Sequence, residues 1–328
     1  MTDLFDTGGP DLNSCADFVN ADTYKKRINA AAKFCVERHK IYLKKSAGMP
    51  KPWTLDPVLQ SGRFCNVYRE LDKVTEWIMS NVINPNLHNP NIMCLALVAR
   101  QINHPDTLGI MINEGFDFFT RPNNTRLFKI FRNIQNTKGT KLVTGAYIVN
   151  TIFPKDFQKV DGSKGDYIAN FFVPKLWEMR DSLRDGLATN SFLKVIDSFK
   201  QVHGIGAFLA NQAAVDLSYT RLLRKATDID STWNPGPGTL KGIRWITDDW
   251  TLSNGQKNLN IALDKYLVDL NTAISKDKLF SSNKSDMRTN LVPISGPNAS
   301  NTLCELSKIV WMATGRRDRM KNRYPGKI

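Results

Sequence analysis

The run from His203 to Tyr219 places the strongest constraint on the fold, because it joins a Gly-Ile-Gly turn to a strongly helical segment. Before this turn, apolar residues recur at helical spacing and predict another helix over 190–201. The expected arrangement is a helix, a tight turn at Gly204 and Gly206, and a second helix. Such a turn exposes backbone N–H groups where the helix dipole is positive, so a DNA phosphate can bind there. A short connection between helices that binds nothing has the same pattern, and this alternative stays open.

A second glycine-rich segment follows at 233–239, with Gly236, Pro237 and Gly238 at its centre. Proline and glycine in succession predict a turn or loop rather than a helix. Glycine also permits close backbone approach, so this loop suits the rim of a site. We expect it, together with His203 and the Gly-Ile-Gly turn, to contact DNA.

The charge balance favours a polyanionic partner. The 328 residues carry a formal net charge of +14. An excess of this size favours nucleic acid first and an anionic membrane surface second. The segment 315–328, which includes Arg316 and Arg317, is strongly basic and is expected to contact the phosphate backbone.

The five cysteines are widely spaced and form no Cys-x-x-Cys pair. This argues against a disulfide framework or an iron–sulfur cluster and is typical of a reducing compartment. With four histidines and no His-Glu-x-x-His motif, a zinc site is not expected. No apolar run reaches membrane-spanning length, and no secretion signal is recognisable at the N-terminus. The expectation is a cytoplasmic protein without a resident metal or other cofactor.

Amphipathic segments fill most of the remaining chain and predict an all-α fold. The expected helices cover 16–45, 62–78, 91–103, 105–119, 121–135, 168–183, 190–201, 256–274 and 301–314. Residues 146–149 are the only credible strand, and they fit a helix equally well. The expected organisation is an N-terminal arm and helix (1–52), a helical domain (53–314) with a turn-rich candidate lobe boundary near 155–167, and a basic tail (315–328).

The helix expected over 62–78 has two distinct sides. Its apolar stripe consists of Phe64, Val67, Leu71, Val74 and Ile78. On another side, Arg63, Asn66 and Arg69 can present planar donors to a phosphorylated ligand. Alternatively, Arg69 pairs with a carboxylate of the same helix, such as Asp72.

Four short motifs, in this order, resemble a known phage family. They are Arg63-Phe64-x-Asn66-x-x-Arg69-x-x-Asp72, then Gly204-Ile205-Gly206-x-Phe208-Leu209-Ala210-x-Gln212-x-x-x-Asp216, then Gly236-Pro237-Gly238 with Gly242, and Leu303-Cys304-Glu305-x-x-Lys308. With them the chain is similar, from about Trp53 to Tyr324, to the alpha-glutamyl/putrescinyl thymine pyrophosphorylases, also described as amino acid:DNA transferases.

The resemblance implies both a fold and an activity. The family is related to helix-hairpin-helix DNA glycosylases, which implies two helical lobes around a cleft that receives a flipped base. The implied reaction replaces the pyrophosphate of 5-pyrophosphoryloxymethyluracil in phage DNA with an amine, either a free amino acid or a polyamine, in the host cytoplasm. A separate kinase supplies the pyrophosphate, and since the sequence has no Gly-x-x-x-x-Gly-Lys-Ser/Thr motif, we do not expect this chain to be that kinase. Mg²⁺ often accompanies pyrophosphate, although no carboxylate cluster here requires it.

Such a displacement needs cations for the departing anion, a base for the amine and a dry pocket. The candidate cations are Arg63, Arg69, Lys241 and Arg244, and the further candidate substrate ligands are Asn66 and Gln212. Asp216 is the first candidate base, with Asp72 and Asp228 as alternatives. Asp216 can equally be a surface carboxylate that pairs with Arg221 or Lys225.

Two other classes of function remain open. A DNA glycosylase would cleave the N-glycosidic bond of a modified pyrimidine with an aspartate and water, and a non-catalytic DNA-binding protein would need only the charge and the hairpin. Several cations around the pocket would favour pyrophosphate chemistry over a glycosylase. A Schiff-base lyase is disfavoured, because Ala207, Phe208 and Leu209 follow the turn where it would need a lysine.

Overall fold

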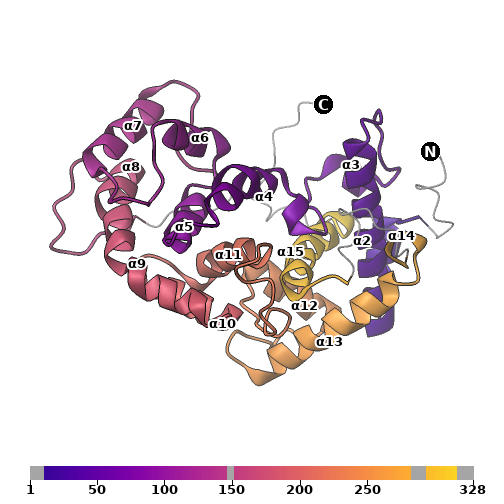
Figure 1. Cartoon of the computed structure of the whole chain (residues 1–328). Coiled ribbons are helices and arrows are strands. Elements are labelled where there is room, and N and C mark those ends of the chain that lie inside the picture. The colour runs from indigo at the N-terminus through magenta and orange to yellow at the C-terminus, as the bar shows by residue number, and fades with distance from the viewer. Residues whose placement is uncertain (1–10, 146–150, 282–292, 316–328) are drawn as a thin grey trace. The chain divides into compact units, whose positions relative to one another are not determined.

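The computed structural model describes residues 11–145, 151–281 and 293–315 (Figure 1). Within these ranges every regular element is a helix, which confirms the all-α fold class. The segment 146–149, Arg316 and Arg317 lie outside the described residues. The chain divides into two compact units, unit 1 with Met1–Arg69 and Pro235–Ile328, and unit 2 with Glu70–Asn234. The boundaries expected near 52 and 155–167 fall inside these units.

Unit 1 combines both ends of the chain. Its helices are α1 (Ser14–Val19), α2 (Tyr24–Ser46), α3 (Pro57–Ser61), α12 (Pro237–Thr247), α13 (Lys257–Ile274), α14 (Lys278–Ser281) and α15 (Gly296–Ala313). α15 packs along α12, and α13 packs along α2. The segment expected as one or two helices over 16–45 therefore forms two, α1 and α2. Asp56 caps α3 by accepting from the Leu59 N–H at 2.9 Å, and it also accepts from the Ser14 N–H at the start of α1 at 2.7 Å.

An aromatic cluster packs around α2 in unit 1. The His39 ring is stacked on Tyr42 and lies edge-on to Tyr68, with ring centroids 5.9 and 5.3 Å apart. The ring of Phe280 packs against it as well. Burial, and secondarily the charge of Arg38, lowers the pKa of His39 to about 4. This histidine is therefore neutral near pH 7 and serves as a core aromatic.

The interface between α12 and α15 depends on two glycines. A Cβ on Gly242 would collide with the backbone carbonyl of Leu303, and a Cβ on Gly238 would collide with the Sγ of Cys304. Without these side chains the two helix backbones approach closely. The prediction that 233–239 cannot be helical is wrong at its end, since α12 begins at Pro237. Proline is tolerated at the first position of a helix, where its missing N–H would have no partner within the helix.

Unit 2 is one continuous segment. Its elements are α4 (Lys73–Ile78), the π-helical turn η3 (Met79–Ile83), η4 (Asn84–Asn86), α5 (Ile92–Ile102), α6 (Pro105–Asn113), α7 (Asn124–Asn136), α8 (Lys164–Asp166), the π-helical turn η5 (Tyr167–Phe172), α9 (Val173–Ala188), α10 (Phe192–Lys200) and α11 (Ala207–Ser218). The 3₁₀ turn η2 (Arg69–Leu71) crosses the division between the units.

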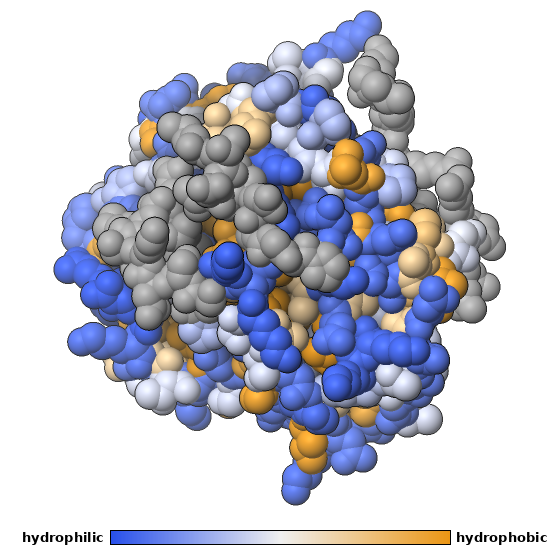
Figure 2. All heavy atoms as spheres, turned by 90° about the vertical axis from the view of Figure 1, so that its right-hand side faces the viewer, coloured by the Kyte–Doolittle hydropathy of each residue, from blue (hydrophilic) through white to orange (hydrophobic). Residues whose placement is uncertain are grey.

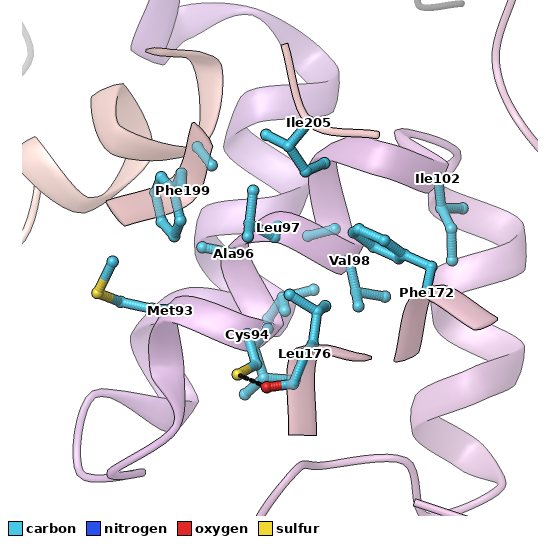
Figure 3. Packing of buried hydrophobic residues seen from close by; sticks show 14 of the residues in the cluster. Met93, Cys94, Ala96, Leu97, Val98, Ile102, Phe172, Leu176, Phe199 and Ile205 are labelled. Carbon is cyan, nitrogen blue, oxygen red and sulfur yellow. Dashed lines mark hydrogen bonds between the residues drawn. The ribbon is translucent and has the colours of Figure 1, made fainter. Parts of the chain in front are cut away.

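The core of unit 2 is built around α5, all of whose residues are buried. α9 and α11 both pack on it. Figure 3 shows Met93, Val98 and Ile102 of this helix among residues of the surrounding elements, and Cys94 near the Leu176 carbonyl, to which its Sγ donates at 3.5 Å. The nearly continuous apolar sequence of 91–103 is thus explained by burial on all sides.

The continuous helix predicted over 62–78 is wrong. Residues 63–68 are irregular, η2 follows, and α4 begins only at Lys73. Of the expected apolar stripe, Val67, Leu71 and Ile78 are nevertheless buried. The helix is displaced because side chains from distant parts of unit 1 satisfy the backbone of this segment, as described below.

Among the described residues, no helix is both long and apolar enough to cross a bilayer. Figure 2 shows a face dominated by hydrophilic residues, on which apolar residues occur singly or in small groups. Scattered apolar residues of this kind are normal on a protein surface.

Candidate functional site

The segment 63–69, which carries the first sequence motif, forms a loop that α15 holds by hydrogen bonds to its backbone. Glu305 accepts from the Cys65 N–H at 3.1 Å, and Asn298 accepts from the Arg69 N–H at 2.9 Å. Asn301 donates to the Asn66 carbonyl at 3.0 Å, and Lys308 donates to the Arg63 carbonyl at 3.3 Å. Four side chains on one helix thus replace the secondary structure that the loop lacks.

α2 holds the same loop from a different helix. The guanidinium of Arg38 donates to the Phe64 carbonyl at 3.1 Å and to the Asn66 side-chain oxygen at 2.6 Å. Asn66 and Arg69, both expected as ligands, are buried, whereas Arg63 is exposed. Of the three residues, Arg63 is the one that is exposed to solvent.

Glu305 and Lys308 of the fourth motif also bond to each other. Their ion pair is close, and Glu305 is only 3% exposed. Burial by itself lowers the pKa of Lys308, but the attraction of Glu305 outweighs it and raises the pKa. Lys308 therefore stays charged, and its ion pair with Glu305 fixes the two side chains that anchor the loop.

The two cations expected on 241–244 have different environments on α12. Arg244 donates through Nε and Nη2 to the Leu252 carbonyl, at 2.8 and 2.6 Å, and so holds the segment that follows the helix. Lys241 is exposed, and its Nζ lies 4.6 Å from the ring centre of Trp311. Lys241 also lines a pocket of about 450 Å³ in unit 1. The geometry gives Arg244 a structural contact and leaves Lys241 facing a cavity.

In unit 2, Asp216 forms an ion pair with Arg100. The Nε and Nη2 atoms of Arg100 donate to the two carboxylate oxygens, each at 2.5 Å. Arg100 donates further to Asn103 and Thr75, at 3.0 Å each. Asp216 is fully buried and Arg100 is 1% exposed. The partner of Asp216 is therefore Arg100, and neither Arg221 nor Lys225, the two partners considered from the sequence.

A signal for Arg100 was present in the sequence. It is the only charged residue in the apolar run of 91–103, which is buried on all sides. A cation in such a helix needs an anion, because an unpaired buried charge is costly. The sequence does not indicate which of the many aspartates supplies it.

The other expected acid–base residues have distinct positions. Asp228 accepts from the Ser191 hydroxyl and from the N–H groups of Phe192 and Leu193, at 2.7 to 3.0 Å, and so caps α10. Although burial opposes it, these donors lower the pKa of Asp228. Asp72 is the half-buried residue directly before α4, and Gln212 is half-buried on α11. The catalytic roles of these residues and of Asp216 stay predictions.

The turn between α10 and α11 has the expected helix, turn, helix form. Gly204 has φ +83°, and a Cβ on it would collide with the Tyr167 hydroxyl oxygen, so two constraints require glycine there. Gly206 precedes α11 and has open space around its Cα. His203 is exposed, and its Nε2 lies 2.8 Å from the Ile152 carbonyl. Contact of this turn with DNA stays a prediction.

In the ranges that the structure describes, no three His, Cys, Asp or Glu side chains gather in a way that could hold a metal ion. Unit 1 thus presents a preorganised arginine-bearing loop and an aromatic pocket lined by two cations and two carboxylates, and unit 2 presents a glycine turn and a buried Arg–Asp pair. These features define an all-helical protein with an exposed arginine on a fixed loop and a tryptophan-lined pocket.

Comparison with known proteins identifies the family. The chain belongs to the family described as "5-hmdU DNA kinase, helical domain", whose model matches residues 25–317. A 5-hmdU DNA kinase of Bacillus phage SP10 is 26% identical over 231 residues, which are 65% of this chain and 35% of the kinase. The chain therefore spans about a third of the length of that relative. Solved structures yielded no match.

The family confirms part of the resemblance seen in the sequence. It places the chain among relatives of phage enzymes that act on 5-hmdU in DNA, as the resemblance to the thymine pyrophosphorylases implied. The family is named for the kinase rather than for the transferase. The matched region is its helical domain, and the sequence shows no phosphate-binding loop.

Proposed function

We propose that this chain acts on DNA that carries modified 5-hydroxymethyluracil and that it transfers an amine to the activated base. In this reaction the nitrogen lone pair of an amino acid or polyamine forms a C–N bond to the methylene on C5. The C–O bond breaks with its electron pair on the departing pyrophosphate, and the ammonium that forms loses a proton to a base. The transfer catalysed by this chain would thus come after the reaction of the kinase for which its family is named.

The observation that supports the proposal is the loop 63–69. Its conformation is fixed by Asn298, Asn301, Glu305 and Lys308 of α15, all of which bond to its backbone. Fixed loops that carry cations are characteristic of sites that stabilise a developing negative charge, because little reorganisation is needed during the reaction. The exposed guanidinium of Arg63 is the group that we assign to the departing pyrophosphate.

The remaining assignments are proposals of the same kind. Asp72 is the candidate base, since it follows the loop directly and is half-buried. Asp216 is less suited to remove a proton, because its two oxygens are bonded to Arg100 in a fully buried position. The hairpin at Gly204 and Gly206 would hold the DNA backbone, as in helix-hairpin-helix proteins.

The experiment uses the purified chain, DNA bearing 5-pyrophosphoryloxymethyluracil and a mixture of amino acids and polyamines. Mass spectrometry of the digested nucleosides should reveal an amine-bearing thymidine. Replacing Arg63 with glutamine is expected to lower the transfer rate about 100-fold, the usual effect of removing one donor to a developing anion.

Arg221→Gln serves as the matched control, because Arg221 is an exposed arginine of unit 2 and its replacement should leave the rate unchanged. Free base with abasic DNA would identify a glycosylase instead and refute the transfer. An unaltered rate in Arg63→Gln would refute the role given to the loop.

The family favours one alternative function. The match to the helical domain of a 5-hmdU DNA kinase suggests a domain that presents DNA to a kinase active site. Adding this chain to a 5-hydroxymethyluracil DNA kinase with its DNA substrate and ATP would then raise the yield of phosphorylated nucleoside, with no amine required. This second reaction mixture separates the two functions in one assay.

A basic surface in unit 2 supports DNA as the partner. Residues 118–155 contain no acidic residue. Within this stretch α7 buries Leu127, Phe128, Phe131 and Ile134 and exposes Lys129 and Arg132, which lie one turn apart. Cations spaced along an exposed helix are suited to successive phosphates.

The variant Lys129→Gln/Arg132→Gln is expected to bind duplex DNA more weakly and with a smaller salt dependence. Loss of two phosphate contacts should reduce the slope of log K against log salt by about 2. Fluorescence anisotropy between low and moderate salt measures this slope. Lys257→Gln/Lys276→Gln removes two exposed lysines of unit 1 and should keep the original slope. Equal slopes in the two double variants would exclude α7 from the DNA contact.

A further inference from the structure

The pocket of about 450 Å³ in unit 1 has the size of a ligand site. It lies between the C-terminal ends of α1, α12 and α15, with Arg27 of α2 and the segment after α12 completing its wall. Of the residues that line this pocket, Lys241 is the one that the sequence predicted as a substrate ligand. No lining residue occupies a specified position of any of the four sequence motifs.

Aromatic rings form a large part of the wall. Three of the chain's seven tryptophans line it, namely Trp245, Trp250 and Trp311. Trp245 is supported by the buried ring of Phe18, with centroids 5.5 Å apart. Trp250 is 55% exposed, which is unusual for so large an apolar side chain. Exposed indole faces in a cavity are suited to stack against a planar ring.

Two cations face the same cavity, and they differ in how they are neutralised. Arg27 lies 5.7 Å from the Trp245 ring centre and donates to the Ala21 carbonyl at 2.9 Å, and its Nη2 is 3.3 Å from Asp248. Lys241 lies over Trp311, and among the described residues no carboxylate forms an ion pair with it. The ammonium of Lys241 therefore brings an uncompensated positive charge to an aromatic wall.

These charges select among small ligands. The two carboxylates of the wall, Asp22 and Asp248, are already paired with Lys26 and Arg27. A polyamine would therefore meet Lys241 with the same sign of charge, and a neutral ring would leave the charge of Lys241 without a counterion. A planar ring joined to an anion satisfies both features, because the ring stacks on indole while the anion approaches Lys241.

We propose that this pocket binds a nucleotide, with the base against Trp250 and its neighbouring indoles and the phosphate at Lys241. Binding of a nucleotide in this pocket does not depend on the proposed transfer of an amine. That the nucleotide is one extruded from DNA, rather than a free one such as ATP, rests on the proposed function.

The test is quenching of the intrinsic tryptophan fluorescence of the full chain. The probes are thymidine 5′-monophosphate, thymidine, ATP and a short single-stranded oligonucleotide containing 5-hydroxymethyluracil. We expect the monophosphate and the oligonucleotide to quench. Lys241→Gln should weaken binding of the monophosphate about tenfold, the loss of one charge-assisted contact, without affecting thymidine. Trp250→Ala should weaken binding of both.

Two controls locate the effect. Lys257→Gln removes an exposed lysine outside the pocket, and Trp53→Ala removes a tryptophan elsewhere in unit 1, so both should bind like the parent chain.

Absence of quenching by every phosphate-bearing probe, or equal affinity in Lys241→Gln and the parent, would overturn the proposal. Quenching by ATP with none by the monophosphate or the oligonucleotide would keep a nucleotide site and refute its DNA origin. Loss of transfer with intact quenching would refute only the proposed reaction.

Discussion

Replacing Arg100 with methionine is expected to lower the free energy of unfolding by about 4 kcal/mol, because it leaves the carboxylate of Asp216 buried without its cation. The pair is fully buried, and Arg100 also donates to Asn103 and Thr75. Urea unfolding followed by circular dichroism measures the loss. A change below about 1 kcal/mol would show that another group or water compensates the charge.

The double variant Arg100→Met/Asp216→Leu should be compared with the single variant Arg100→Met. Removing both charges avoids the unpaired ion, so most of the lost stability should return. It also separates two roles of Asp216. A double variant that folds well and still transfers amine would exclude Asp216 as the base, whereas a folded but inactive one would support the original prediction.

The second large effect is expected from Gly242→Ala. The added methyl group would overlap the Leu303 carbonyl and lie 2.7 Å from its carbon, so α12 and α15 must separate. Overpacking of this kind costs about 1–3 kcal/mol, and the upper end applies because the obstacle is backbone and cannot rotate away. The expected observation is a lower thermal midpoint for unit 1.

Gly109→Ala is the matched control, since Gly109 also lies inside a helix, α6. There a Cβ would meet only Trp77, at an ordinary distance of 3.6 Å. Alanine should then be neutral or stabilising by up to about 1 kcal/mol through helix propensity. If both variants lost the same stability, a general cost of replacing glycine in these helices would explain the result, and the close approach of α12 and α15 would not.

Local periodicity predicted the helices that bury a face of their own. Residues 91–103 and 256–274 became α5 (Ile92–Ile102) and α13 (Lys257–Ile274), because apolar spacing in these segments is decided by neighbours three and four residues away. The segment 62–78 has the same spacing and is nevertheless irregular as far as Tyr68. Its backbone partners are on α15, more than 200 residues further along the chain, and no local pattern encodes them.

In the candidate site, too, local sequence predicted some residues, and others were placed only by tertiary contacts. Sequence motifs identified Arg63, Glu305, Lys308, Gly238 and Gly242, and the structure brings all five into one framework in unit 1. The pairing of Asp216 with Arg100 and the clustering of three tryptophans around Lys241 escaped the sequence analysis. Both depend on which helices become neighbours, which is decided by tertiary packing.

The split composition of unit 1 has a consequence for biosynthesis. Unit 2 is a contiguous stretch that can assemble as soon as the ribosome has released residues 70–234. The loop 63–69 is made earlier, yet its backbone partners at 298–308 follow more than 200 residues later in the chain. The arginine-bearing loop therefore acquires its final shape only after α15 has been made, so a nascent chain can contain a finished unit 2 and still lack the contacts that fix this loop.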